Sequence, residues 1–238
     1  MKLTILSDSA EPFADRDEAG MDLGNVLRQR IAESPLILGV PRGGIVTASA
    51  IAAVLDCDVD ILLAHKIRAP FNPELAVGAM SEDGHVVLSA NRVQALEADS
   101  TYIEREKKEQ REELNRRRKL FRSAYPKIPL RDRVVVITDD GVATGATVQA
   151  ALWAARREKP KKLIGAFPVA PPETLKKLGA DADEIICLKA PAMFYAISQF
   201  YLAFDQVPDS EVLEILRKER RRKEARDKTT STHKEKRQ

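Results

Sequence analysis

Short apolar runs rich in β-branched residues alternate with segments of helical periodicity through most of the chain. The runs have the length of buried strands and lie at 36–40, 59–64, 134–138, 163–169 and 184–188. The helical segments lie at 45–55, 145–156 and 172–178, and Leu23, Leu27 and Ile31 share one helical face ahead of the first run. Strands that are apolar throughout and separated by helices are typical of a parallel sheet covered on both faces. The pattern therefore predicts an α/β fold.

A hairpin and a loop interrupt this alternation. The sequence Ser-Glu-Asp-Gly at 81–84 separates apolar runs at 76–80 and 85–89, which predicts a β-hairpin. The segment 66–74 ahead of it contains two prolines and an asparagine, and these residues predict a loop.

The segment 91–122 is long and highly charged, with a thin apolar stripe. The stripe consists of Leu96, Ile103, Leu114 and Phe121. We expect one or two helices that pack along the edge of the domain or against another subunit, with the charges on a solvated face.

Positive charge is concentrated at the C-terminus. The chain carries a net charge of +3, but residues 217–238 contain eleven Lys/Arg and four Asp/Glu, a local charge of +7 that leaves −4 for residues 1–216. We expect one domain over 1–216, with a helical and hairpin insertion at about 66–125. The basic tail is expected to end a helix and to be disordered from about Lys223.

Two features of the composition exclude other classes of protein. No run approaches the roughly 20 apolar residues of a membrane span, and the N-terminus lacks the basic start and apolar stretch of a secretory signal, so we expect a cytoplasmic protein. Cys57 and Cys187 each lie in an apolar stretch and are expected to be buried thiols, since no spacing suggests a metal site and a reducing compartment disfavours a disulfide.

The stretch 134–147 carries most of the chemical information. Its strand ends in Asp139 and Asp140, at the edge where open α/β sheets bind ligands, and the small residues of the 141–147 loop then open a helix. Such a loop lets backbone N–H groups approach a phosphate, and the helix N-terminus adds unpaired donors. Two adjacent carboxylates repel each other unless a cation or polyol lies nearby, which favours a sugar phosphate site over a plain helix cap. Lys and Ser/Thr do not follow Gly145, so this is not the Walker A motif of NTPases.

A second loop has related chemistry. Gly43 and Gly44 follow the first strand and expose backbone N–H groups, and Arg42 offers a planar donor fork suited to phosphate oxygens. Lys66 and Arg68 follow the second strand and have the length to reach the same ligand. Taken alone, these residues are also consistent with a tight turn and with solvated loop cations.

The stretch 134–147 resembles the signature of type I phosphoribosyltransferases for 5-phosphoribosyl-1-pyrophosphate (PRPP): four apolar residues, two acids, a small loop with Thr-Gly, then Thr. The resemblance implies that Asp139 and Asp140 hold the ribose 2- and 3-hydroxyls and bind Mg²⁺, a cofactor of the reaction, through water. The residues implied for the 5-phosphate are Val142, Ala143, Thr144, Gly145, Ala146 and Thr147. Similarity continues over about 22–216 and matches a subgroup of predicted phosphoribosyltransferases of unassigned substrate, found alone or fused to hydrolase domains.

The same resemblance assigns the second loop to pyrophosphate and implies a cis peptide bond between Pro41 and Arg42. The implied pyrophosphate-binding residues are Arg42, Gly43, Gly44, Lys66 and Arg68. The implied catalytic residues are Asp139, Asp140, Arg42 and Lys66. A mobile loop that closes over the reaction is expected near the hairpin.

The implied fold is the Rossmann-like type I phosphoribosyltransferase sheet, flanked by helices, with a hairpin and flexible-loop insertion, charged edge helices and a small hood. The hood would comprise about 1–22 and 189–207. It would contain an aromatic cluster of Phe194, Tyr195, Phe200, Tyr201 and Phe204. A ring in the hood would be able to stack on a base, although aromatic residues at this spacing are more often core. Ala143 stands where hypoxanthine-guanine enzymes carry an aspartate, which argues against 6-oxopurine salvage.

These features imply an enzyme of nucleotide metabolism that transfers the phosphoribosyl group of PRPP to a small nitrogen acceptor, such as a nucleobase, and releases pyrophosphate. A homodimer is expected, and no membrane partner. Two alternatives remain open: a PRPP-sensing regulator whose basic tail contacts nucleic acid, and an interaction protein that partners a hydrolase.

Overall fold

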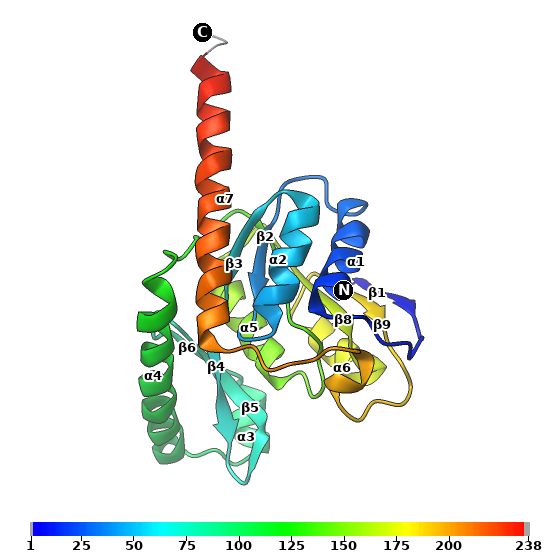
Figure 1. Ribbon diagram of the computed structural model, residues 1–238. Helices are drawn as coiled ribbons and strands as arrows, with labels where there is room; N and C mark the ends of the chain where they lie inside the picture. Colours follow the sequence, from blue (N-terminus) through cyan, green and yellow to red (C-terminus); the bar gives the residue numbers. More distant parts are fainter. Residues whose placement is uncertain (1, 236–238) are drawn as a thin grey trace.

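The computed structural model describes residues 2–235 and folds them into two sheets surrounded by helices (Figure 1). The larger sheet has six parallel strands in the order β1-β9-β8-β7-β2-β3. In chain order these strands are β1 (Lys2–Ser7), β2 (Leu36–Gly39), β3 (Asp58–Ile61), β7 (Val134–Thr138), β8 (Lys162–Val169) and β9 (Glu184–Lys189). The parallel α/β fold predicted from the apolar runs is confirmed.

Helices cover both faces of the larger sheet and also pack against the smaller sheet. They are α1 (Arg16–Arg28), α2 (Gly44–Leu55), α3 (Ala90–Ala95), α4 (Ser100–Arg122), α5 (Ala146–Arg157), α6 (Pro172–Gly179), the short 3₁₀ helix η1 (Ile197–Phe200) and α7 (Asp209–Glu235). Helices α1 and α2 pack against each other on one face, whereas α5 packs between the other face and the smaller sheet (Figure 1). Every residue of β2 and β7 is buried, as expected for central strands covered on both sides.

The smaller sheet is antiparallel and extends the predicted hairpin by one strand. Its strands are β4 (Ala64–Ala69), β5 (Asn72–Ser81) and β6 (Val86–Leu88). The hairpin of β5 and β6 is confirmed, but the prediction that 66–74 is a loop is wrong. Lys66 pairs with Ala79, and only Pro70 and Phe71 lie between β4 and β5. A proline is compatible with a turn or with the start of a strand, so the prolines did not exclude this hairpin.

The first strand departs from the expected hood. Residues 2–7 form β1, which pairs in parallel with β9 at one edge of the larger sheet. Because an edge strand is only partly covered, β1 shows no continuous buried run and was not recognised as a strand.

The charged segment forms two helices, α3 and α4, as predicted. Ile103, Leu114 and Phe121 of the apolar stripe are buried, and α4 packs along β4. At the end of α4, Arg122 lies between two carboxylates: its Nη1 is 2.6 Å from Asp60 Oδ1, and its Nη2 is 2.6 Å from Glu82 Oε1. This ion triplet joins α4 to both sheets.

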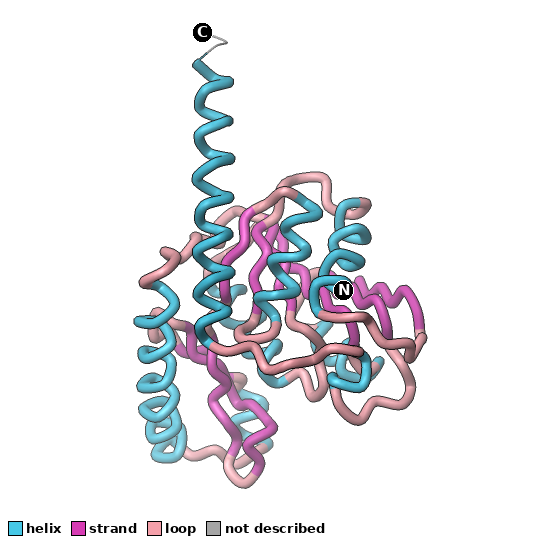
Figure 2. Tube along the Cα trace, viewed as in Figure 1, coloured by secondary structure: helices cyan, strands magenta, loops and turns pink. Residues whose placement is uncertain are grey.

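Helix α7 corrects the prediction of a disordered tail. The chain is helical through Glu235, and Figure 2 shows the far half of α7 projecting beyond the rest of the molecule. Charged side chains just past its middle anchor it: Lys223 Nζ is 3.1 Å and Arg226 Nη2 is 2.8 Å from the two oxygens of Asp58. Composition alone missed this helix because its partner Asp58 lies at the start of β3, far away in the sequence. Residues 236–238 of the tail lie outside the described residues.

Both cysteines are buried free thiols, as predicted. Burial raises the pKa of Cys57 and of Cys187 to about 12, because an apolar environment disfavours the thiolate. Among the helices of residues 2–235, none is long and apolar enough to cross a membrane.

Candidate functional site

The carboxyl ends of β2 and β7 bring the two predicted loops together. The strands pair in parallel, with Gly39 opposite Thr138, and the Val40 amide extends the ladder by donating to the Thr138 carbonyl at 2.9 Å. Asp139 and Asp140, called here the acidic pair, follow directly, and the Asp140 amide donates to Asp139 Oδ1 at 2.9 Å. The 40–44 loop and the acidic pair therefore share one edge of the sheet.

The glycines of the 40–44 loop are required by this close approach. A Cβ on Gly43 would lie 1.9 Å from Asp140 Oδ2, and a Cβ on Gly44 would lie 2.9 Å from the Asp139 Cα. The loop thus packs on the acidic pair itself, a constraint that the sequence did not reveal. The cis peptide bond between Pro41 and Arg42 is confirmed, and the Arg42 side chain is exposed.

The 141–147 loop is held in place from both sides and ends at the N-terminus of α5. The Val142 amide donates to the Val169 carbonyl at 2.9 Å, and Thr174 Oγ1 donates to the Ala143 carbonyl at 2.8 Å. Gly145 caps α5 with a φ of 81°, a left-handed conformation that favours glycine. Val142 is buried, so only its backbone is suited to face a ligand, whereas Thr144 and Thr147 are exposed. The loop presents amides and two hydroxyls at a helix N-terminus, the chemistry of an anion site.

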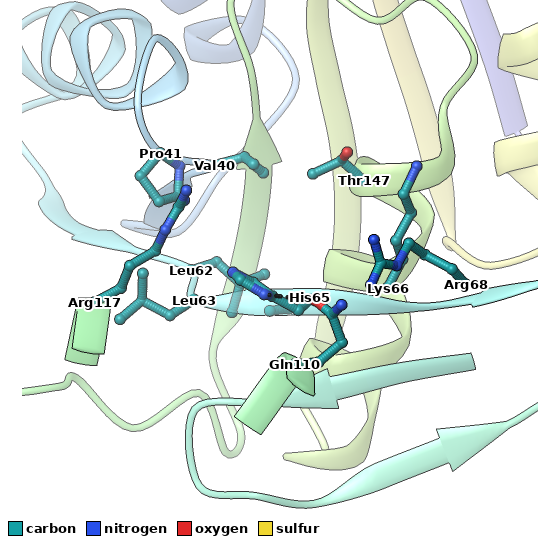
Figure 3. Close-up of a pocket in the computed structure, with 11 residues that line it drawn as sticks. Val40, Pro41, Leu62, Leu63, His65, Lys66, Arg68, Gln110, Arg117 and Thr147 are labelled. Atoms are coloured by element: carbon teal, nitrogen blue, oxygen red, sulfur yellow. Dashed lines mark hydrogen bonds between the residues drawn. The ribbon is translucent and has the colours of Figure 1, made fainter. Parts of the chain in front are cut away.

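A cavity of about 280 Å³ lies beneath these loops (Figure 3). Its walls are Val40, Pro41, Leu62, Leu63, Ala64, His65, Lys66, Arg68, Gln110, Arg117 and Thr147. Three of the sequence-predicted segments meet here: the 40–44 loop through Pro41, the 141–147 loop through Thr147, and β4 through Lys66 and Arg68. The acidic pair does not line this cavity.

Side chains of α4 hold two polar residues of the cavity wall, Arg68 and His65. Arg68 Nε lies 2.5 Å from Glu106 Oε1, and its Nη2 lies 3.1 Å from Glu109 Oε2, so α4 binds this guanidinium. The His65 ring is hydrogen-bonded to Gln110 at 3.0 Å, and burial lowers the pKa of His65, which favours the neutral ring and a structural role.

The acidic pair has a counter-ion that sequence reasoning missed. Arg16 Nε donates to Asp140 Oδ2 at 2.8 Å, and both side chains are almost buried, with 11% and 12% exposed. Burial, and then the charge of Asp140, raise the pKa of Asp139 well above its ordinary value. No local motif marks Arg16, because it lies at the start of α1, 124 residues before its partner.

The predicted hood packs over the acidic pair. The Tyr201 hydroxyl donates to the Asp140 carbonyl, and the Phe13 amide donates to the Phe200 carbonyl at 2.8 Å. Phe200 and Tyr201 are buried, whereas 84% of Tyr195 is exposed. The aromatic cluster is thus partly core, as expected, and leaves one ring at the surface.

Comparisons with known proteins assign this arrangement to a family. The sequence profile of the phosphoribosyl transferase domain matches residues 15–205. Two proteins of Mycobacterium tuberculosis, from strains CDC 1551 / Oshkosh and H37Rv, are each 40% identical over 204 residues, and their names mark them provisionally as phosphoribosyl transferases. These matches cover 86% of the chain and 46% of each relative, so the chain spans about half their length. The crystal structure of the protein TT1426 from Thermus thermophilus is 41% identical, with a TM-score of 0.83 over 87% of this chain and 98% of that chain.

Proposed function

The chain belongs to the phosphoribosyl transferase family, with the type I fold, and on that basis we propose that it binds PRPP and transfers the phosphoribosyl group to a nitrogen acceptor, with release of pyrophosphate. The observation that carries the proposal is the junction at the end of β7. There the acidic pair leads directly into an anchored loop at a helix N-terminus, and the 40–44 loop lies against it. Carboxylates for a sugar and amides for its phosphate therefore follow one another at a single sheet edge.

In this proposal the 141–147 loop binds the 5-phosphate. The backbone amides of residues 143–147 and the exposed Thr144 and Thr147 supply donors, and the N-terminus of α5 adds partial positive charge. The acidic pair would accept hydrogen bonds from the ribose 2- and 3-hydroxyls. Each group thus meets the part of PRPP whose polarity it matches.

The pyrophosphate would lie between the 40–44 loop and β4. The exposed Arg42, the amides of Gly43 and Gly44, and Lys66 supply the positive charge at this position. Negative charge grows on pyrophosphate as its bond to the ribose C1 breaks, so fixed donors here stabilise the transition state more than the ground state. Arg68 is the weaker candidate for this role because Glu106 and Glu109 already bind its guanidinium.

The acidic pair also fits Mg²⁺, which binds proteins through one or two carboxylates together with substrate phosphates. Arg16, 2.8 Å from Asp140 Oδ2, is already a cationic partner of the pair. Within residues 2–235 no cluster of three or more His, Cys, Asp or Glu offers a metal site built from protein alone. When bound, Mg²⁺ would neutralise charge on the phosphates of PRPP.

The acceptor is proposed to be a nucleobase other than a 6-oxopurine. Ala143 is exposed in the 141–147 loop, and its methyl group neither donates nor accepts a hydrogen bond. A base that needs a hydrogen-bond partner at this position would bind with its own polar groups unpaired. The loss of such hydrogen bonds is the strongest source of discrimination between similar substrates. The homodimer and the cytoplasmic location expected from the sequence stay predictions.

Release of pyrophosphate tests the proposed transfer. Incubation of the chain with PRPP, Mg²⁺ and single purine or pyrimidine bases should give one pyrophosphate per nucleotide formed with at least one base. Adenine should react faster than hypoxanthine or guanine. Binding of PRPP without pyrophosphate release from any base would contradict the enzyme and favour the PRPP-sensing regulator.

The close packing of the two loops gives a sharper test of the site. We expect Gly43→Ala to weaken PRPP binding at least about tenfold, because the new Cβ displaces the Asp140 carboxylate on which the sugar depends. Titration calorimetry measures the affinity, and circular dichroism checks the fold. Gly84→Ala is the control: it lies in the β5–β6 turn with open space around it, so it should lower stability and leave the affinity unchanged. Equal affinities of Gly43→Ala and the unmodified chain would contradict the assignment.

A further inference from the structure

Arg16 links the acidic pair to residues 200–205, called here the hood segment. Its Nε donates to Asp140 Oδ2 at 2.8 Å, its Nη1 donates to the Asp205 carbonyl at 2.9 Å, and its guanidinium carbon lies 3.9 Å from the centre of the Phe204 ring. Three contacts from two distant parts of the chain therefore fix one almost buried side chain. The hydrogen bond from Arg16 to Asp140 joins two charged groups, and such charge-assisted hydrogen bonds are about twice as strong as neutral ones.

The hood segment itself is packed on the same backbone. Tyr201 donates to the Asp140 carbonyl and stacks on Phe204 with ring centres 5.0 Å apart. The Arg16 contacts to Phe204 and Asp205 thus continue a layer that begins at the acidic pair. Movement of Arg16 away from Asp140 would loosen its contacts to Phe204 and Asp205.

The proposed ligand would approach the same carboxylate that Arg16 binds. The proposed function requires Asp140 to accept hydrogen bonds from ribose hydroxyls or to face Mg²⁺, but its Oδ2 already accepts from Arg16. A guanidinium in this position also repels a divalent cation. A ligand group that binds at Oδ2 would take the position that Arg16 Nε holds.

We propose that Arg16 is the internal counter-ion of the acidic pair in the free protein, and that PRPP with Mg²⁺ must displace it from Asp140 to bind. The inference rests on the proposed function. Displacement breaks a charge-assisted hydrogen bond and loosens the contacts to Phe204 and Asp205, so binding at the acidic pair is coupled to the hood. The free energy of the lost contact is subtracted from the free energy of binding.

Removal of Arg16 should therefore tighten binding. Arg16→Gln leaves the two carboxylates without their counter-ion, and their repulsion is then relieved by the incoming cation. We expect Arg16→Gln to bind PRPP roughly tenfold more tightly at saturating Mg²⁺, the equivalent of one charge-assisted hydrogen bond. In the absence of PRPP, Mg²⁺ should raise the melting temperature of this variant more than that of the unmodified chain.

Two further variants guard against a folding defect. Arg16→Lys keeps the charge but loses the planar fork, so its affinity should lie between those of Arg16→Gln and the unmodified chain. Phe204→Leu weakens the hold on Arg16 without touching a carboxylate, and it should change affinity in the same direction by a smaller factor.

Titration calorimetry with PRPP and Mg²⁺ on the four proteins decides between the outcomes. Tighter binding by Arg16→Gln supports the inference. Unchanged or weaker binding by Arg16→Gln, when the unmodified chain binds, overturns the inference alone and makes Arg16 neutral or a ligand contact. Failure of all four proteins to bind PRPP would overturn the proposed function and the inference with it.

Discussion

Replacement of both members of the acidic pair, Asp139→Asn with Asp140→Asn, should lower the affinity for PRPP in the presence of Mg²⁺ by at least about a hundredfold. Each carboxylate is proposed to accept a charge-assisted hydrogen bond worth about 1.5–3 kcal/mol, and asparagine lacks the negative charge with which a carboxylate attracts Mg²⁺. The fold should persist, since the 40–44 loop packs on side chains of nearly the same size. Calorimetric titration of PRPP into both proteins measures the effect.

A matched control separates this site from a general effect of charge. Asp181→Asn with Asp183→Asn also removes two carboxylate charges, but just ahead of β9, at the amino ends of the parallel strands. There Asp181 accepts a hydrogen bond from Trp153 and Asp183 accepts one from Arg156. This control should cost stability and leave the PRPP affinity unchanged. Equal affinity of the Asp139/Asp140 variant and the unmodified chain would show that the acidic pair does not hold the sugar.

Arg122→Met should lower the free energy of unfolding by about 3–5 kcal/mol, the usual cost of leaving buried charges without their partner. Arg122 is the counter-ion of Asp60 and Glu82, whose side chains are 0% and 4% exposed. Burial already raises the pKa of Asp60, and the charge of Arg122 opposes that shift. Urea denaturation followed by circular dichroism measures the loss.

The pH dependence of Arg122→Met has a definite sign. Without Arg122 the pKa of Asp60 in the folded state rises further above its unfolded value, so the folded variant binds protons more tightly than the unfolded chain. The loss of unfolding free energy relative to the unmodified chain should therefore be largest at neutral pH. It should shrink as the pH falls into the range where carboxyl groups take up protons. Arg116→Met, on the exposed face of the same helix, is the control and should unfold like the unmodified chain. Equal losses for the two variants, or a deficit that does not depend on pH, would contradict this account of the triplet.

The central strands and the two loops were predictable because their signals are local. The buried run of β7 ends at the acidic pair, and the small residues that follow indicate where the helix α5 begins. The 40–44 loop carries its own signature in Arg42 and the two glycines. In each case neighbouring residues determine both the backbone and the chemistry, so a window of about a dozen residues is sufficient.

The features that sequence reasoning missed depend on distant partners. β1 becomes a strand because β9 offers a free edge, and Lys66 lies in a strand because β5 pairs with it. Helix α7 is held by Asp58 at the start of β3. Most consequential for the site, Arg16 reaches Asp140 over 124 residues. Propensity and periodicity carry no information about such contacts, which form only once the fold is assembled.

A calorimetric titration of the unmodified chain with PRPP in the presence of Mg²⁺ tests the proposed binding site most directly. We expect one saturable site per chain, with an affinity in the range of about 1 μM to 1 mM that is typical of enzymes for their substrates. Absence of saturable binding with PRPP at about 1 mM or above would contradict this expectation, because the carboxylates and amides at the end of β7 would then serve some other ligand.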